Sequence, residues 1–508
     1  MAKIILWILL NLGIAIPASY CQGGFNKAIS FQGHKGLNFD DILLDAEGIV
    51  ANGNIYIDSS ELWGLFLIKM DTLGNMLWHT SFIDPEGTSH IIQNTPTRFI
   101  RSSDSSYVIP VKVANRGNIG IVKIGLNGEL IYFKEFKTLD PYIRANAIVE
   151  SCGSYYISGW IDRLNLGTDY FLLKTDLLGE IIWIKYYGSS EFEELSHGLI
   201  AGKDSSVTMC GIIYPPNISE LGFEGQWYRP WILTVSPKGE SIFEWKGVPN
   251  DDRTTNAAGC VRAPNGDWGF IYNEFRLIKV DFTDRIYTVP AISVLDSNFN
   301  LKWKNTYGEY NSSLNTFYDL SFDSIRKEWV AVGQIAKNSG IAGVIVKYSQ
   351  EGEFLWSSEN YLYNDSSIHA RHWIGGVALS AAGTSYTAGH VEYTNPPFYD
   401  YGWILKITAD GCVDTLCSTT SISNHLNSAE EFSLYPNPSS DIVIIKSKVG
   451  FSSYRVLDMS GKVRIKEDHI TGSAEYKVDV SKLNAGMYIM QIVNEKNQRS
   501  MVKFIVSH

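Results

Sequence analysis

The segment LLKTDLLGEIIWIKYYG, residues 172–188, has a lysine five positions before a glycine and a tryptophan four positions after that glycine. Seven related segments occur along the chain, at intervals of 51 to 60 residues. The positions equivalent to this glycine are Gly74, Gly128, Gly179, Gly239, Phe299, Gly352 and Gly411. A repeat of this length is typical of propeller blades or of solenoid coils.

Each copy has the pattern of a β-hairpin, because apolar and β-favouring residues flank a four-residue turn such as DTLG. The glycine supplies the positive φ that the last position of the turn needs. Two more strand-like segments precede each hairpin, as in ANAIVESCGSYYISGW, residues 145–160. Four short strands per repeat predict an all-β fold, a seven-bladed β-propeller. A solenoid is the alternative, although coils of about 20–30 residues would be shorter than these repeats.

The seventh copy lacks the usual fourth strand, because CVDTLCS stands in its place. NKAISFQG, residues 26–33, resembles the fourth strands of other copies, such as IKYYG. We therefore predict that residues 27–33 complete the last blade and close the ring, which leaves only short sheet edges exposed.

The repeats resemble the bacterial seven-bladed propeller repeat family, whose blades end in a pattern like D-x-x-G-x-x-x-W-x-x-x-Y-G-G. The likeness covers most of residues 25–417 and concerns the fold rather than chemistry. Sialidase Asp boxes have other spacings, since Asp71, Gly74 and Trp78 are three and four residues apart. The docking motif of quinone-dependent dehydrogenases is one residue longer between aspartate and glycine, and a shared fold carries no activity.

The composition changes beyond a polar linker at residues 418–431. Residues 432–508 hold 11 Lys and Arg against 7 Asp and Glu, whereas residues 22–431 have a net charge of −16. An acidic body of this kind makes nucleic acid an unfavourable partner. Five strand-like segments predict that residues 432–508 form a small β-sandwich.

This module resembles the type A C-terminal sorting domain of the type IX secretion system. The resemblance rests on LYPNP, LDMSGK, LNAGMY and VKFIV, at residues 434–438, 457–462, 483–488 and 502–506. It implies export through the periplasm by the type IX secretion machinery, removal by a sortase-like peptidase, and a secreted or cell-surface protein. A carbohydrate-binding or fibronectin-like sandwich is the alternative. The sorting-motif residues are Tyr435, Pro436, Asn437, Pro438, Gly461, Asn484, Gly486, Tyr488 and Lys503.

The first 21 residues have the pattern of a signal peptide, with a short basic start, an apolar run and small residues before Gln22. Acylation of Cys21 is the alternative, which the bulky Tyr20 disfavours. No later apolar run reaches the roughly 18 residues of a membrane span. We predict a disulfide between Cys412 and Cys417, with free thiols as the alternative. Three further cysteines, in separate apolar strands, are expected to be buried small hydrophobes: they are Cys152, Cys210 and Cys260.

Three loops between second and third strands are long, and loops on a rigid scaffold commonly carry binding. Aromatic rings beside acids and an arginine suit a glycan or a protein surface. The candidate ligand-binding residues are Trp227, Tyr228, Arg229, Tyr287, Tyr393, Phe398, Tyr399 and Asp400. The alternative is that these side chains pack between blades.

The other polar residues are expected to have structural rather than catalytic or metal-binding roles. His197, His369 and His372 approach the same face, but isolated hydrogen-bonded histidines are the simpler interpretation, so we predict no metal and no cofactor. The acid pairs Asp251–Asp252 and Glu193–Glu194 are expected to be solvated loop charges. The lysines that recur in the repeats are expected to pair with turn carboxylates; they are Lys69, Lys123, Lys174, Lys347 and Lys406.

No motif of a catalytic class is present, and we predict no catalytic residue. The sequence thus predicts a secreted or cell-surface monomer that binds a glycan or a protein without catalysis. A secreted polysaccharide hydrolase or lyase, and a structural surface component, are the alternatives.

Overall fold

The computed structural model of the chain describes residues 24–31, 34–92, 97–137, 142–163, 167–189, 192–214, 229–247, 254–280, 283–337, 340–362, 370–393, 400–413, 432–447, 451–458, 463–468, 475–494 and 499–507. The chain divides into two compact units, Met1–Ser418 and Thr419–His508. The predicted signal peptide and linker lie outside the described residues. Among these residues, no helix has the length and apolar character needed to cross a membrane.

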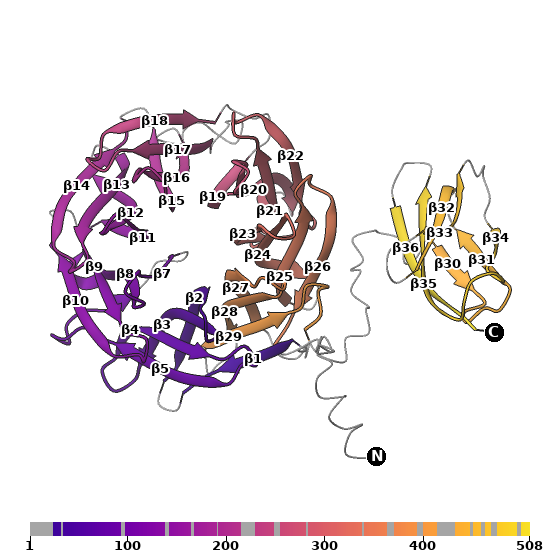
Figure 1. Cartoon of the computed structure of the whole chain (residues 1–508), viewed down its shortest axis with the longest axis horizontal. Coiled ribbons are helices and arrows are strands. Elements are labelled where there is room, and N and C mark those ends of the chain that lie inside the picture. The colour runs from indigo at the N-terminus through magenta and orange to yellow at the C-terminus, as the bar shows by residue number, and fades with distance from the viewer. Residues whose placement is uncertain are drawn as a thin grey trace, which may run out of the picture. The chain divides into compact units, whose positions relative to one another are not determined.

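The first unit is a ring of blades whose strands are antiparallel within each blade, which confirms the predicted all-β propeller (Figure 1). Parallel bridges join blades 6, 7 and 1 into one twelve-stranded sheet. Blade 1 contains β2 (Gly36–Leu44), β3 (Ile49–Ile57), β4 (Leu62–Met70) and β5 (Met76–Phe82). Blade 2 contains β6 (Ile91–Ile92), β7 (Ile100–Arg101), β8 (Tyr107–Val113), β9 (Asn118–Ile124) and β10 (Leu130–Phe136). Blade 3 contains β11 (Ile143–Ser151), β12 (Ser154–Arg163), β13 (Gly167–Asp176) and β14 (Ile181–Tyr187).

The other four blades follow in chain order around the ring. Blade 4 contains β15 (Glu193–Ala201), β16 (Val207–Tyr214), β17 (Arg229–Val235) and β18 (Ser241–Lys246). Blade 5 contains β19 (Thr254–Arg262), β20 (Trp268–Val280), β21 (Thr283–Leu295) and β22 (Leu301–Thr306). Blade 6 contains β23 (Thr316–Asp323), β24 (Glu328–Lys337), β25 (Gly340–Ser349) and β26 (Phe354–Asn360). Blade 7 contains β27 (Ala370–Leu379), β28 (Ser385–Tyr393), β29 (Asp400–Ile407) and the N-terminal β1 (Phe25–Ile29).

The N-terminal strand closes the ring, as predicted, although its bounds are Phe25–Ile29 rather than residues 27–33. β1 is antiparallel to β29, with Phe25 opposite Lys406 and Ile29 opposite Gly402. The indole N–H of Trp403 donates to Oδ1 of Asn26 at 2.6 Å, and Lys27 Nζ donates to the carbonyl of Gly74 at 2.5 Å. The last blade therefore combines both ends of the propeller.

The recurring glycine and tryptophan interlock neighbouring blades. A Cβ at Gly352 would lie 2.6 Å from the ring of Trp303 in the preceding blade, and one at Gly411 would lie 3.2 Å from the ring of Trp356. Both glycines have positive φ. In the fifth copy Phe299 adopts a φ of 65° and stacks on Trp245, with ring centroids 4.6 Å apart. The repeat thus encodes both a turn and a space for the neighbour's ring.

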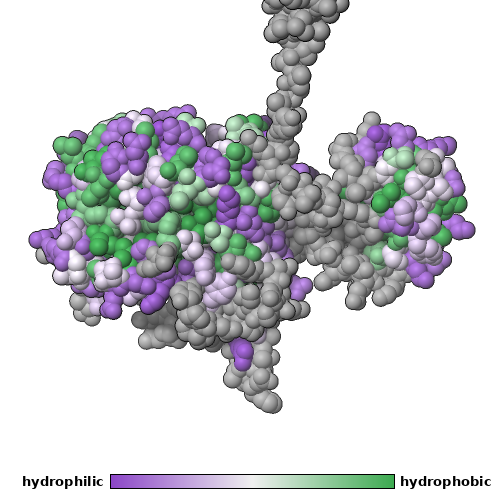
Figure 2. Space-filling model, turned by 90° about the horizontal axis from the view of Figure 1, so that it is seen from below, coloured by the Kyte–Doolittle hydropathy of each residue, from purple (hydrophilic) through white to green (hydrophobic). Residues whose placement is uncertain are grey.

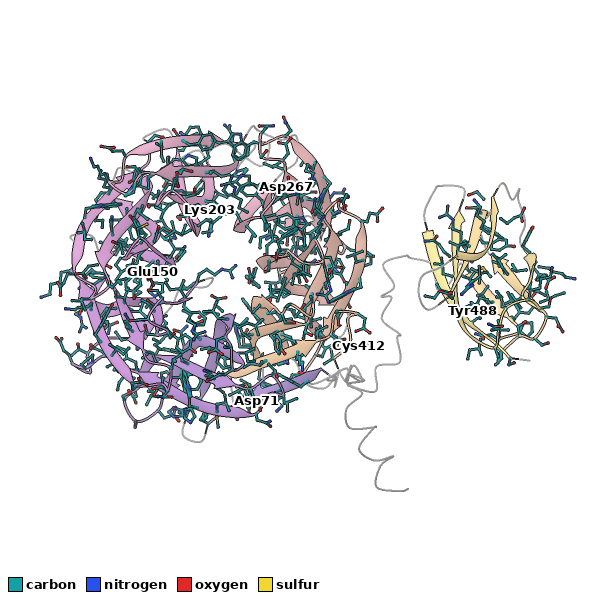
Figure 3. The ribbon with its side chains drawn as sticks, viewed as in Figure 1. Asp71, Glu150, Lys203, Asp267, Cys412 and Tyr488 are labelled. Atoms are coloured by element: carbon teal, nitrogen blue, oxygen red, sulfur yellow. A yellow bond between two sulfur atoms is a disulfide. The ribbon has the colours of Figure 1, made fainter. Side chains whose placement is uncertain are left out.

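Two kinds of turn lie at different distances from the axis of the ring. Figure 3 places Lys203, in a turn between first and second strands, nearer this axis than Asp71, in a turn between third and fourth strands. Lys69 pairs with the turn residues Asp45 and Glu47, at 3.0 and 2.7 Å, which confirms the predicted role of this lysine.

The other recurring lysines follow this plan in part. Lys123 pairs with Asp104 and Lys347 with Glu328. Lys174 and Lys406 donate instead to carbonyl groups of the next blade's turn.

The fourth strands form the rim of the disc and begin with exposed apolar residues. A β-bulge at this point lets two consecutive side chains face outward. Ile181 and Ile182, for example, are 51% and 53% exposed, as are Met76 and Leu77 to a similar degree. Figure 2 shows apolar patches among polar ones on this rim.

An ion cluster joins the first strands of several blades. Arg98, just before β7, donates from one guanidinium nitrogen to Asp41 in β2 at 3.3 Å and to Asp319 in β23 at 2.8 Å. A second guanidinium nitrogen pairs with the other oxygen of Asp319. The carboxylate of Asp319 also accepts the N–H of Val377 in blade 7 at 2.8 Å, and that of Asp41 accepts the N–H of Phe99 at 3.3 Å. One guanidinium therefore connects blades 1, 2 and 6.

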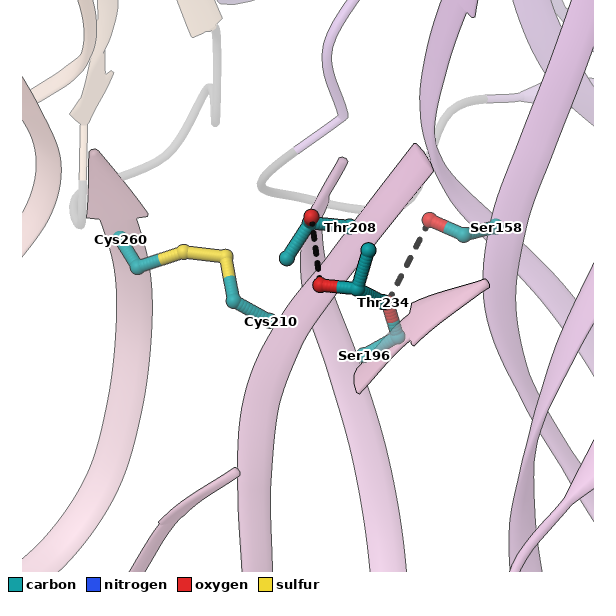
Figure 4. The surroundings of a disulfide bond; sticks show 6 residues. All are labelled: Ser158, Ser196, Thr208, Cys210, Thr234 and Cys260. Carbon is teal, nitrogen blue, oxygen red and sulfur yellow. Dashed lines mark hydrogen bonds between the residues drawn. A yellow bond between two sulfur atoms is a disulfide. The ribbon is translucent and has the colours of Figure 1, made fainter. Parts of the chain in front are cut away.

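The structure corrects the prediction for three cysteines. Cys152 is exposed in the turn after β11 and is not a buried small hydrophobe. Cys210 in β16 and Cys260 in β19 form a disulfide between blades 4 and 5, instead of being separate buried thiols (Figure 4). The two residues belong to blades adjacent in the ring, a proximity that appears only once the blades are arranged in space. Cys412 is buried, and its predicted partner Cys417 lies outside the described residues. That disulfide stays a prediction.

The second unit packs two sheets around one apolar core. One sheet has the order β30 (Phe432–Tyr435), β31 (Ile442–Ser447), β34 (Glu475–Asp479). The other has the order β33 (Val463–Asp468), β32 (Phe451–Asp458), β35 (Gly486–Asn494), β36 (Arg499–Val506). Phe451, Val456 and Phe504 are among its fully buried residues.

Candidate functional site

The structure brings together two of the eight predicted binding residues, Tyr393 and Asp400. Arg229 begins β17 and stacks over Phe192, and Tyr287 lies in a hairpin that extends β20 and β21. Both are therefore on other blades. The remaining four residues lie outside the described part of the chain: Trp227, Tyr228, Phe398 and Tyr399.

Tyr393 and Asp400 line a pocket of ≈ 310 Å³ at the seam between blades 7 and 1, which we call the seam pocket. Its volume is at the lower end of the range for small-molecule sites. The sequence interpretation missed five lining residues, because four of them lie in strands and one lies just before β2, rather than in the long loops. These are Lys35, Gly36, Tyr56, Trp63 and Glu392.

The floor of the seam pocket is a row of residues paired across strands. Glu392 lies opposite Asp400 in blade 7, and Asp400 is bridged to Gly36 of blade 1. Gly36 in turn lies opposite Tyr56, and Tyr56 opposite Trp63. Residues directly opposite each other in a sheet point to the same side. Ring closure thus places two carboxylates next to two aromatic rings.

A glycine at position 36 is required by the aromatic wall. A Cβ there would be 2.7 Å from the indole ring of Trp63, a distance that real contacts essentially never show. The rings of Tyr56 and Trp63 meet edge to face, with centroids 5.5 Å apart and an angle of 65°. The backbone N–H of Trp63 also donates to Nδ1 of His90 at 3.0 Å. These contacts hold the indole in place.

The two carboxylates differ in their surroundings. Glu392 is 3.5 Å from the guanidinium of Arg371, its cross-strand neighbour in β27. Burial, and after it the charge of Glu392, raise the pKa of Asp400 to about 6. Asp400 is therefore mostly ionised at pH 7, but a moderate change of surroundings would protonate it.

The arrangement favours hydrogen bonding over hydrolysis. Glycoside hydrolysis requires two carboxyl groups that flank the scissile bond. Glu392 and Asp400 lie side by side on neighbouring strands and point to the same side of one sheet. Such a pair accepts hydroxyl or ammonium hydrogen bonds, while the aromatic rings pack against apolar faces of a ligand.

The candidate histidines are not brought together. His197 is in blade 4, and burial lowers its pKa to about 4. His372 is in blade 7, where its Nδ1 lies 2.9 Å from the carbonyl of Ile341. His369 lies outside the described residues. Where the structure describes the chain, no group of three or more His, Cys, Asp or Glu has metal-binding geometry.

One acid pair differs from the prediction. Glu194 is fully buried in β15, between blades 3 and 4, and is not a solvated loop charge. The neighbouring blade covers it, an effect that local sequence does not reveal. Asp251 and Asp252 lie outside the described residues.

In the C-terminal unit, the LYPNP segment is fixed to the last strand. Oδ1 of Asn437 accepts the N–H of Ile505 at 2.8 Å, and the N–H of Ser439 donates to the carbonyl of Ile505 at 2.9 Å. The hydroxyl of Tyr488 donates to the carbonyl of Asn484 at 3.0 Å. Gly461, and the side chain of Lys503, are outside the described parts. The other predicted motif residues thus lie at the end of β30 and the turn after it, and at the start of β35.

Residues 433–507 match a family model described as a secretion system C-terminal sorting domain. The C-terminal unit is a secretion-system sorting domain. This sorting domain marks the protein as a substrate of type IX secretion, located outside the cell or at its surface. The match confirms the predicted resemblance of the module and the predicted location.

No curated protein matches the chain. Among solved structures, the β-propeller domain of the Trilobed protease from Pyrococcus furiosus is 9% identical, with a TM-score of 0.38, and the match covers 74% of this chain and 94% of that one. Acylaminoacyl peptidase from Pyrococcus horikoshii is 11% identical, with a TM-score of 0.37 and coverage of 83% and 59%. A member of the duf4221 family from Bacteroides vulgatus is 11% identical, with a TM-score of 0.32 and coverage of 75% and 96%. Scores this low carry no argument about activity.

Proposed function

We propose that the exported propeller is a non-catalytic binding module that recognises a saccharide in the seam pocket. The observation that carries the proposal is the row that joins Glu392 and Asp400 to Tyr56 and Trp63 across the closing seam. Aromatic rings pack on the C–H faces of a sugar, and carboxylates accept hydrogen bonds from its hydroxyl groups. A protein surface is a poorer match, because ≈ 310 Å³ holds one or two sugar rings rather than a broad epitope.

The test is a glycan and polysaccharide binding screen of the full chain, followed by calorimetry with the best ligand. Trp63→Ala is expected to weaken binding about tenfold or more, because it removes the aromatic wall. Trp160→Ala is the matched control, since Trp160 lies in β12 and stacks with Arg144 away from the pocket. Equal affinities of wild type and Trp63→Ala would refute the proposal.

Hydrolysis is followed in the same samples as release of reducing ends. The proposal expects none over the course of the binding assay. If reducing ends appear with the wild type and not with Asp400→Asn, the seam pocket is a catalytic site and the proposal of a non-catalytic module is wrong.

Export through the sorting domain gives a separate expectation. Deleting residues 432–508 should retain the propeller in the periplasm, because the segment that the export machinery recognises is gone. Immunoblots of periplasm and culture medium measure this. A retained propeller that still holds its Cys210–Cys260 disulfide would show that folding is intact. Unchanged levels outside the cell would contradict the assignment of the route.

A further inference from the structure

Three carboxylates meet at the seam between blades 3 and 4. Asp169 lies in β13, and Glu193 and Glu194 begin β15. Glu194 is fully buried and Asp169 is 9% exposed. Oε1 of Glu194 accepts hydrogen bonds from the N–H and the hydroxyl of Ser189, at 3.1 and 3.3 Å. Oε2 of Glu194 is buried and has no hydrogen-bond partner.

Gly188 lies against two of these carboxylates. A Cβ at this position would lie 2.1 Å from Oδ1 of Asp169 and 2.9 Å from Oε2 of Glu194. The two oxygens are therefore no more than about 5 Å apart, since both lie within these distances of one point. A Cβ at position 188 would clash with both carboxylates, so the glycine is what lets the two oxygens lie this close to each other and to the backbone.

Positive charge at this seam is insufficient for three carboxylates. Arg163 pairs with Oδ2 of Asp169 at 3.1 Å, and not with Oδ1, the oxygen beside Gly188. Lys246 attracts Glu194 only weakly, and its ammonium group pairs with Glu244 at 3.1 Å. Glu193 accepts the N–H of Thr168 at 2.5 Å. Buried carboxylates of like charge are costly unless a cation or a proton neutralises them.

We propose that Asp169 and Glu194 bind a divalent cation, with calcium the species that fits best. Calcium takes six to eight oxygen ligands at about 2.3–2.6 Å, so one ion spans two oxygens that are about 5 Å apart. Main-chain carbonyls and water would complete the shell. Two carboxylates suit the weak affinity, roughly 10⁻⁴–10⁻³ M, of extracellular calcium modules. The ion would link β13 of blade 3 to β15 of blade 4.

The competing outcome is a proton in place of the cation. Burial, and after it the charge of Asp169, raise the pKa of Glu194 to about 8. A pair that only shares a proton would show no response to calcium at neutral pH. The presence or absence of that response decides between the two.

Chelator-treated full-length protein is titrated with terbium and calcium at pH 7. Tyr170 follows Asp169 and stacks on Trp231 with centroids 4.4 Å apart, so bound terbium should show sensitised emission that calcium displaces. Calcium at about tenfold above its Kd should raise Tm by roughly 2 °C or more. The terbium titration of the wild type tests the proposal even if the variants do not fold.

Glu194→Gln and Gly188→Ala are expected to abolish both responses, the first by removing a charged ligand and the second by pushing the two oxygens away from the backbone. Glu180→Gln, which removes an exposed carboxylate that pairs with Lys134, is the matched control and should respond as the wild type does. The proposal is overturned if the wild type neither binds terbium nor gains stability with calcium. It is equally overturned if Glu194→Gln responds like the wild type.

Discussion

Replacing both Cys210 and Cys260 with serine is expected to lower the free energy of unfolding of the propeller by about 4 kcal/mol. The disulfide closes a loop with a sequence separation of 50 residues, and loop closure of this size removes much of the entropy of the unfolded chain. Figure 4 shows the bond between the second strand of blade 4 and the first strand of blade 5. The bond therefore fixes two blades that share no sheet.

The seam between blades 4 and 5 is where this bond matters most. Among the described residues its apolar cluster holds five buried side chains, whereas the cluster between blades 5 and 6 holds fourteen. Gly198 makes room for the bond, because a Cβ there would lie 2.9 Å from Sγ of Cys210. Among the described side chains, the covalent link thus supplements the seam with the smaller apolar cluster of the two.

Urea denaturation followed by tryptophan fluorescence measures the effect on unfolding. Cys152→Ser is the control, since Cys152 is an exposed free thiol, and its stability should change by less than about 0.5 kcal/mol. Reduction of the wild type should reproduce the double serine variant. A double variant within about 1 kcal/mol of the wild type would show that the bond contributes little.

The parts of the fold that sequence predicts are those whose cause is local. The turn glycine and the aromatic residue of the fourth strand recur together, because the ring of one blade packs against the turn glycine of the next blade. Trp303, for example, packs against Gly352. The closing strand was predictable from local sequence too, since it resembles the fourth strands of the other blades and serves as the fourth strand of blade 7. The bounds of this strand were not predictable, because its register depends on its pairing with β29.

Sites at seams were missed because they join residues that are distant in sequence. Trp63 and Asp400 reach one pocket only after the ring closes. Glu194 has the local pattern of an exposed acid, and its burial comes from blade 3. The long loops indicated Tyr393 and Asp400, but loop length carries no information on which strands of the next blade lie beside them.

The largest electrostatic effect is expected at the ion cluster of Arg98, Asp41 and Asp319. Arg98→Met should lower the free energy of unfolding by about 3–5 kcal/mol, because it leaves the buried carboxylates of Asp41 and Asp319 without a cation. Arg144→Met is the control. Arg144 lies in the first strand of blade 3 and stacks on Trp160, so its loss should cost less than about 1 kcal/mol. Equal losses in the two variants would contradict this role for Arg98.

Asp41→Asn is expected to act in the opposite direction and to depend on pH. Burial is the main cause that raises the pKa of Asp41 from 3.8 to about 7, the charge of Asp319 adds to it, and Arg98 opposes it. Between these two values the folded protein holds a proton that the unfolded chain has lost. The contribution of Asp41 to stability therefore falls as pH rises through this window, and its full cost is present above pH 7.

Asparagine resembles the protonated acid and does not titrate, so this cost disappears in the variant. The stability of Asp41→Asn relative to wild type should increase by about 2–3 kcal/mol between pH 5 and pH 8. Urea denaturation at both pH values measures the difference. Parallel pH profiles for wild type and Asp41→Asn would contradict the raised pKa of Asp41, because they would mean that Asp41 releases its proton at the same pH in the folded and the unfolded protein.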